Sequence, residues 1–269
     1  MPEETTLLTF GGHLEVLRQM LWRVLIVIIV LAAGVFCFKD ATFSLLLAPS
    51  EWNFITYRWI ERAANTMGYD FHFDPWHVDL IATDLSSQFM THITTSLYIG
   101  ALMASPYIVS ELFHFVSPAL YENEKKYSVR VVVTVYVLFF LGLLLTYFVL
   151  FPISFRFLGT YSVAERIHST ITLDSYITTF LTLSLMMGVV FQLPVVAFIL
   201  AKMGVLTAEM LSKYRKQAVL LIMIVSAIIT PPDLMTLVLV SLPLYVLYEG
   251  CIYVVRWTGQ KESTDFMES

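Results

Sequence analysis

Four long apolar runs are the feature that most constrains what this chain can fold into. Residues 21–38, 89–109, 131–151 and 177–201 are each long enough for a helix to cross a hydrocarbon core of about 30 Å. Two shorter runs, 218–229 and 234–248, rise only about 18 and 22 Å as helices, so each needs a thinned bilayer or packed neighbours. Since 58% of the residues are hydrophobic and only 14% are charged, a soluble domain is excluded. The sequence predicts an all-α integral membrane protein with six transmembrane helices, the last two short.

The two short runs are separated by Pro231, Pro232 and Asp233. Proline donates no backbone hydrogen bond and disfavours a helical residue before it, which predicts a tight helical hairpin. The alternative is one kinked span, which gives five in total. The positive-inside rule favours six, because both termini then share the cytoplasmic side with most of the basic residues. These are Arg18, Arg23, Lys125, Lys126, Arg130, Lys202, Lys213, Arg215, Lys216, Arg256 and Lys261, eleven of the 16.

The chain between Lys39 and Gln88 is polar and is predicted to lie on the outer side of the membrane. Within it, residues 50–65 place Trp52, Ile55 and Trp59 near one face of a helix, with most charges elsewhere. A helix in the headgroup layer fits this pattern, and a helix packed over the mouth of the spans would look similar.

The stretch YDFHFDPWHVD holds residue types that bind zinc. We predict no metal site, because His-x-Asp and Asp-x-x-His spacings recur by chance and no cysteine or His-Glu-x-x-His pattern supports a closed site. The residues concerned are Asp70, His72, Asp74, His77 and Asp79. Phosphate-binding glycine loops, nucleophile elbows and paired intramembrane aspartates are also lacking, so the sequence predicts no enzyme and no cofactor. Any process that the chain drives must draw energy from a partner or from the membrane potential.

Polar residues lie inside two predicted spans. Gln192 is near the middle of span four, two residues before Pro194, whose ring loosens the preceding turn. We interpret this amide as a group that holds water or backbone in a partly wet groove. Glu249 of span six is predicted to reach the interface near Arg256. The hydroxyls of span four fit a role in helix association equally well. They belong to Ser175, Thr178, Thr179, Thr182 and Ser184.

Six short motifs follow one another along the chain. They are HLEVLR (13–18), AP (48–49), FVSPALYENEKK (115–126), YFVLFP (147–152), FQLP (191–194) and TPPD (230–233). In this order, on a six-span frame, they resemble the TatC family, the multispanning receptor subunit of the twin-arginine protein translocase. The resemblance implies one concave, glove-like domain over residues 1–257, an added outer segment at about 51–80, and a cytoplasmic tail, predicted to be disordered, at 258–269.

The resemblance implies a role in protein export. A protein of this family recognises signal peptides with consecutive arginines. With TatA-like and TatB-like single-span partners and other copies of itself, it exports folded proteins using the proton-motive force. The implied location is the cytoplasmic (inner) membrane of a prokaryote, with both termini in the cytoplasm. The lipid bilayer is a further implied partner, and the resemblance implies no binding of nucleic acid.

Two glutamates, Glu122 and Glu124, precede span three on the predicted cytoplasmic side. A guanidinium offers a planar fork of donors that a carboxylate accepts with both oxygens, which lysine cannot match. An acidic first helical turn that complements the helix dipole explains the same residues. The resemblance implies that Glu124, in Tyr-x-x-Glu-Lys, reads the arginines, with Glu122 beside it.

The resemblance also assigns residues outside this pair of glutamates. Signal-peptide binding is implied for Leu17, Arg18, Phe115 and Pro118, and docking of a TatB-type partner for span five. Each of the residues carried over by position has a packing or turn role as its alternative. The residues with a docking or structural role are Pro49, Ser226, Thr230 and Asp233.

Two positions depart from the family pattern. Val16 stands where the family usually has a glutamate, and the acid is Glu15, about 100° around the helix. Glu15 could serve only if that helix rotates or the peptide shifts. Gln192 stands where many relatives have a glutamate, and an amide matches a protonated acid in shape but cannot titrate.

The alternative function is a small-solute secondary transporter. That class predicts an internal repeat with matching broken helices in both halves. The hairpin at Pro231 and Pro232 has no counterpart in spans two and three. An intramembrane enzyme is a third class, and it lacks a nucleophile paired with a base.

Overall fold

Helices make up most of the chain in its computed structural model, which describes residues 10–70, 72–73, 75–116, 128–162, 164 and 170–267. The all-α fold predicted from the sequence is confirmed, with one two-residue strand pair added. The chain divides into two units. Unit 1 comprises Met1–Lys39 and His92–Tyr136, and unit 2 comprises Asp40–Thr91 and Val137–Ser269.

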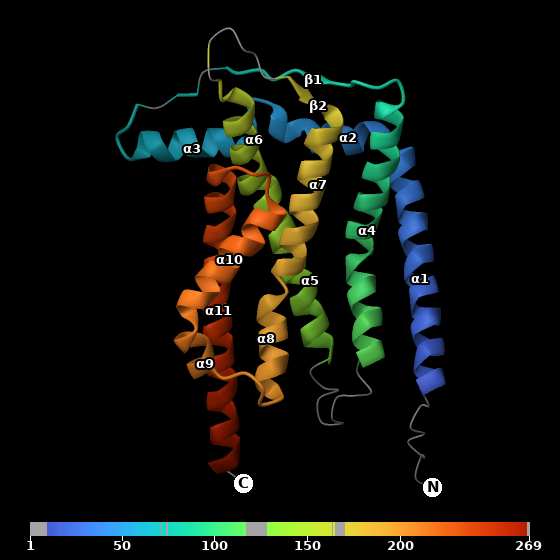
Figure 1. Cartoon of the computed structure of the whole chain (residues 1–269), viewed down its shortest axis with the longest axis vertical. Coiled ribbons are helices and arrows are strands. Elements are labelled where there is room, and N and C mark those ends of the chain that lie inside the picture. The colour runs from blue at the N-terminus through green and yellow to red at the C-terminus, as the bar shows by residue number, and fades with distance from the viewer. Residues whose placement is uncertain are drawn as a thin grey trace. The chain divides into compact units, whose positions relative to one another are not determined.

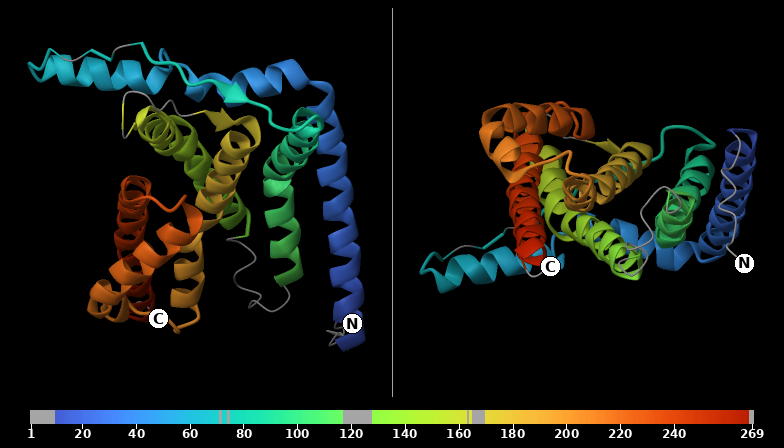
Figure 2. Two further views of the ribbon diagram at one scale, coloured as in Figure 1. Left: turned by 45° about the horizontal axis from the view of Figure 1, so that its top comes forward. Right: turned by 90° about the horizontal axis from the view of Figure 1, so that it is seen from below.

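Unit 1 is built on two helices that run side by side, α1 (Phe10–Cys37) and α4 (Ser87–Val116) (Figures 1 and 2). Their backbones meet closely at Gly100, where an added Cβ would lie 2.7 Å from the Ala32 nitrogen. Near the C-terminal end of α1 and the N-terminal end of α4, the rings of Phe36 and His92 stack with centroids 4.0 Å apart. The start of α5 (Ser128–Leu145) completes the unit.

Unit 2 holds the remaining apolar helices. Helix α5 passes through a π-helical turn, Thr146–Leu150, into α6 (Phe151–Thr160), and α7 (Leu173–Val190) is followed by α8 (Leu193–Lys202). The short α9 (Ala208–Lys213) leads to α10 (Arg215–Ile229) and α11 (Leu234–Met267). Helix α11 packs against α8, α9 and α10. The predicted hairpin is confirmed, because helix α10 ends before Pro231 and α11 begins after Asp233.

A cap of short elements covers the end of unit 2 opposite α9 (Figure 1). It consists of α2 (Lys39–Leu47), a 3₁₀ turn (Ala48–Ser50), α3 (Ile55–Thr66) and the parallel pair β1 (Leu80–Ile81) and β2 (Ile171–Thr172). The predicted helix at 50–65 is therefore present as α3. Its Trp59 is 67% exposed, whereas Tyr57 is 1% exposed, so α3 packs over the span ends through the tyrosine.

Tyr57 ties this cap to the helices below it. Its hydroxyl donates to the carbonyl of Pro152 at 2.8 Å and lies 3.3 Å from that of Pro49. Burial raises the pKa of the Tyr57 phenol above its usual value, so the donor stays protonated. Pro152 has no N–H for the carbonyl of Phe148, four residues earlier, and this oxygen accepts the hydroxyl of Thr56.

Five described segments are long and apolar enough to cross a membrane. They are Leu14–Cys37, Ser87–Glu111, Val132–Thr160, Leu173–Lys202 and Leu234–Gly259. The sixth expected span is α10, which has 15 residues, so the count of six and the concave bundle stay predictions. Helix α11 continues to Met267, through the start of the expected tail, and the division of the chain at residue 257 stays a prediction.

Candidate functional site

The two glutamates expected to read arginines lie in residues 117–127, outside the described chain, as does Pro118. Helix α4 ends at Val116 just before this segment, and α5 begins at Ser128 just after it. Phe115 belongs to the last turn of α4. The described part of the site is therefore the helical frame from which the segment emerges.

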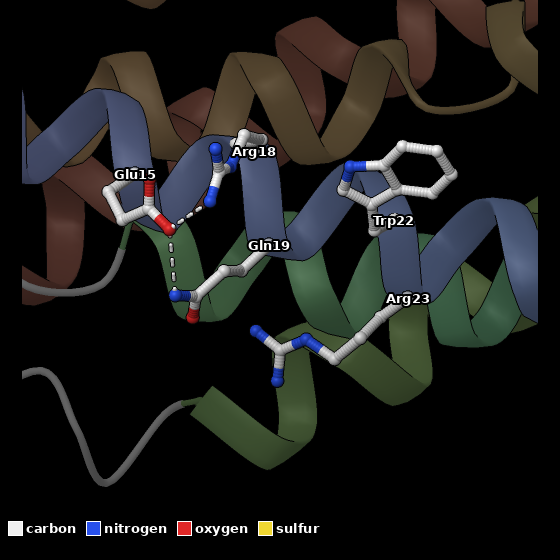
Figure 3. Close-up of a pocket in the computed structure, with 5 residues that line it drawn as sticks. All are labelled: Glu15, Arg18, Gln19, Trp22 and Arg23. Carbon is white, nitrogen blue, oxygen red and sulfur yellow. Dashed lines mark hydrogen bonds and ion pairs between the residues drawn. The ribbon is translucent and has the colours of Figure 1, made fainter.

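The N-terminal part of α1 forms an open, polar pocket of about 430 Å³ (Figure 3). Glu15 accepts hydrogen bonds from Arg18 at 2.7 Å and from Gln19 at 3.1 Å. Trp22 and Arg23 complete the lining. Because these residues recur at spacings of three and four, one side of the helix carries a connected polar row.

The departure at Val16 leaves an apolar side chain on the surface of α1. Val16 is 38% exposed, while Leu17 is half-buried and Met20 is buried. The Glu15 carboxylate is 48% exposed, and its contacts go to its own helix. Glu15 is thus available on the surface and already bonded to Arg18.

A second carboxylate, which the sequence analysis missed, lies between the two helices of unit 1. The Glu111 side chain is 16% exposed, and one of its oxygens accepts the Tyr107 hydroxyl at 2.7 Å. The other oxygen lies 3.4 Å from a guanidinium nitrogen of Arg23. One signal could have revealed it: Arg23 falls inside the first apolar run, and a charge there requires a partner.

Gln192 lies at a break in the helix, as predicted. Helix α7 ends at Val190 and α8 begins at Leu193, with Pro194 in its first turn. The half-buried Gln192 amide donates to the carbonyl of Gly188 at 3.2 Å. The bonded carbonyl belongs to the preceding turn, so the partly wet groove around the amide stays a prediction.

Two glycines fix the backbone next to Gln192. A Cβ added at Gly142 of α5 would lie 2.8 Å from the carbonyl oxygen of Met187, and one at Gly188 would lie 2.7 Å from the Phe139 ring. Helices α5 and α7 therefore approach as closely as two glycines allow, one turn before the break.

The residues assigned a docking or structural role all make contacts within unit 2. Ser226 is fully buried, and Thr230 donates its hydroxyl to the Ser226 carbonyl at 2.8 Å. Asp233 caps α11 by accepting the N–H of Thr236 at 2.6 Å. Pro49 is buried beneath Tyr57. These contacts favour the structural alternative for each residue.

Glu249 makes contacts that the expectation of a side chain reaching the interface near Arg256 did not include. Its carboxylate binds Arg215 of α10 at 2.9 Å and accepts the Tyr245 hydroxyl at 3.2 Å. Arg256 lies about two turns further along α11 and lines another pocket, with Glu209. The pair between Glu249 and Arg215 thus joins α10 to α11.

The described His residues of the outer segment lie next to carboxylates, and His72 lies 3.9 Å from Glu61 as well as near Asp70. His77 lies 3.0 Å from Asp79, and His72 lies 3.5 Å from Asp70. Asp74 lies outside the described residues. Among the residues that were placed, no three potential ligands gather into a group able to hold a metal ion.

Comparison with known proteins gives one consistent result. The family model described as Sec-independent protein translocase protein (TatC) matches residues 12–243. A Sec-independent protein translocase protein TatC from Desulforapulum autotrophicum is 33% identical over 260 residues, covering 97% of this chain and 88% of that protein. Its counterpart from Blattabacterium sp. subsp. Periplaneta americana is 29% identical, covering 97% of this chain and 100% of that protein. A crystal structure of the twin arginine translocase receptor TatC matches with a TM-score of 0.72 and 29% identity, covering 92% of this chain and 99% of that chain.

Proposed function

Because this chain belongs to the TatC family and is a multi-pass membrane component of a Sec-independent protein translocase, we propose that it is the receptor that captures signal peptides with paired arginines. The observation that carries the proposal is the likeness to a solved twin arginine translocase receptor over 92% of this chain. The polar end of α1 and the carboxylates ahead of α5 supply suitable chemistry at the predicted cytoplasmic surface.

Glu124 is the proposed reader of the arginine pair. A carboxylate accepts two parallel N–H bonds from one guanidinium, and such charge-assisted pairs are about twice as strong as neutral hydrogen bonds. Lysine offers a point charge without this fork. Glu122, Leu17, Arg18, Phe115 and Pro118 are proposed to border the bound peptide.

The remaining parts of the proposal concern export itself. Beyond capture, the chain recruits TatA-like and TatB-like single-span proteins and further copies of itself, with α10 and α11 as the docking region. It lies in the cytoplasmic membrane of a prokaryote with both termini inside, and the proton-motive force drives export of folded cargo. Ser226 and Thr230 are buried, so a partner on α10 would meet its exposed apolar face, which includes Leu221 and Ile228.

The test is capture of a synthetic signal peptide by the full chain in membranes. A photoreactive residue placed beside the arginine pair of the peptide leaves every receptor residue intact. We expect crosslinks to residues 117–127 with two arginines and about tenfold fewer with two lysines, given the strength of hydrogen bonds to charged groups. Glu124→Ala should abolish this preference, and Glu122→Ala, a matched change two residues away, should retain it. Equal crosslinking of both peptides by the unaltered chain would refute the receptor proposal, and equal losses in both variants would refute the assignment of Glu124.

A further inference from the structure

Two of the Tyr-x-x-x-Glu pairs in the described part of the chain each face an arginine from another helix. On α4, Tyr107 donates to Glu111 at 2.7 Å, and Arg23 of α1 lies 3.4 Å from the other carboxylate oxygen. On α11, Tyr245 donates to Glu249 at 3.2 Å, and Arg215 of α10 lies 2.9 Å from the other oxygen. The same arrangement therefore occurs once with a loosely held arginine and once with a tightly held one.

The Arg23 contact with the Glu111 carboxylate is long. Charge-assisted N–H bonds to carboxylates are about 2.7–2.9 Å long, which the Arg215 contact matches and the Arg23 contact, at 3.4 Å, exceeds. An ionised carboxylate has about four lone-pair positions, and among the described residues one tyrosine and one distant nitrogen do not fill them. Glu111 can therefore accept a better-placed guanidinium.

Glu111 is also the less exposed of the two described carboxylates of unit 1. Its side chain is 16% exposed, against 48% for Glu15. Away from bulk water, attraction between opposite charges is less screened. A guanidinium that reached Glu111 would be held more strongly than one on the helix surface.

Arg23 stands between Glu111 and the open pocket on α1. Its guanidinium lines the pocket of about 430 Å³ together with Glu15, Arg18 and Gln19 (Figure 3). The same guanidinium faces Glu111. A rotation of the long Arg23 side chain, which is 56% exposed, would open the carboxylate to the pocket.

We propose that Glu111 is a second arginine-binding carboxylate, and that an arginine of the signal peptide displaces Arg23 from it. This inference rests on the proposed receptor function. When a peptide arginine replaces Arg23, the number of charges at Glu111 is unchanged. The gain in binding free energy comes from replacing one long contact by a bidentate pair. A lysine cannot make that pair, so the exchange favours arginine over lysine.

The experiment measures the dissociation constants of two signal peptides, with paired arginines or paired lysines, from the purified full chain in nanodiscs. The variants are Glu111→Gln, which keeps an acceptor for Tyr107, Arg23→Gln, and the two combined. Glu249→Gln and Arg215→Gln are the matched controls, since they alter the same arrangement on α11. Thermal unfolding of each variant reports whether the fold is kept.

The expected outcome is specific to arginine. Glu111→Gln should weaken binding of the arginine peptide about tenfold and leave the lysine peptide unchanged, since a bond to a charged group is lost. Arg23→Gln should tighten binding of the arginine peptide, and the combined variant should lose this gain. An unchanged preference for arginine in Glu111→Gln, or an equal loss in Glu249→Gln, would overturn the role of Glu111 while leaving the receptor function intact. Equal binding of both peptides by the unaltered chain would overturn both.

Discussion

The close approach of α5 and α7 gives the sharpest prediction of stability. In Gly142→Ala the new Cβ would lie 2.8 Å from the carbonyl oxygen of Met187 and 3.0 Å from its carbonyl carbon. Both atoms belong to the backbone, so no side-chain rotation relieves the contact and the helices must separate. Gly188, whose carbonyl accepts the Gln192 amide, would move with α7.

The magnitude follows from two opposing terms. Overpacking of a tight interface costs about 1–3 kcal/mol. Replacing a helical glycine by alanine gains about 1 kcal/mol of helix propensity. Gly250→Ala in α11 should show only the gain in helix propensity, because nothing lies within 4 Å of its added Cβ. The difference between the two variants therefore isolates the contact, and we expect Gly142→Ala to be less stable than Gly250→Ala by about 1–3 kcal/mol.

The assay is reversible unfolding of the purified chain in mixed micelles of increasing SDS fraction, followed by the fluorescence of its 5 tryptophans. Free energies of unfolding are compared at one SDS fraction, so no long extrapolation enters. Equal stability of the two alanine variants would show that α5 and α7 are not in backbone contact at Gly142. The same result would remove the argument that this contact positions Gln192.

Three further changes test the cap, the hairpin and the helix break. Tyr57→Phe should lower the free energy of unfolding by about 1 kcal/mol in the same SDS titration, because a buried hydrogen bond to the Pro152 carbonyl is lost; an unchanged midpoint would contradict it. Asp233→Ala should lower the free energy of unfolding by about 0.5–2 kcal/mol, because the cap of α11 is removed. Asp233→Asn keeps an acceptor oxygen and should lower it less. Gln192→Leu should impair transport of a folded reporter into inverted vesicles while Gln192→Glu is tolerated, and an active leucine variant would count against a polar role.

The helices were predictable because their signals are local. The length of an apolar run fixes whether a helix can span a bilayer. Proline ends a helix at two places, although Pro106 and Pro243 lie inside α4 and α11. The break before Pro194 and the hairpin at Pro231 and Pro232 follow from one residue type, and both are present. The helix at 50–65 followed from its periodicity in the same way.

The contacts between helices were not predictable from such signals. Whether Glu249 meets Arg215 depends on how α10 and α11 are rotated about their axes. Apolar runs carry little rotational information, because lipid-facing and buried positions are both apolar. The inward side of α3 is set by Tyr57, although the exposed Trp59, with Trp52 just before the helix, dominates the sequence pattern. The Glu111 cluster was missed because Arg23 was counted only as a cytoplasmic charge.

The chemistry at Gln192 excludes one way in which the proposed export could use a proton gradient. The amide is neutral at every physiological pH, and its N–H bond to the Gly188 carbonyl needs no protonation change. A mechanism in which this position takes up and releases a proton is therefore impossible here, even though the backbone around it is held by the glycine contact with α5. What Gln192 can supply is a fixed donor at a break between α7 and α8, where Pro194 leaves the helical hydrogen-bond pattern incomplete. Under the proposed function, any contribution of Gln192 to transport is then a matter of hydrogen-bond geometry, which a glutamic acid kept protonated by its apolar surroundings would reproduce and a leucine would not.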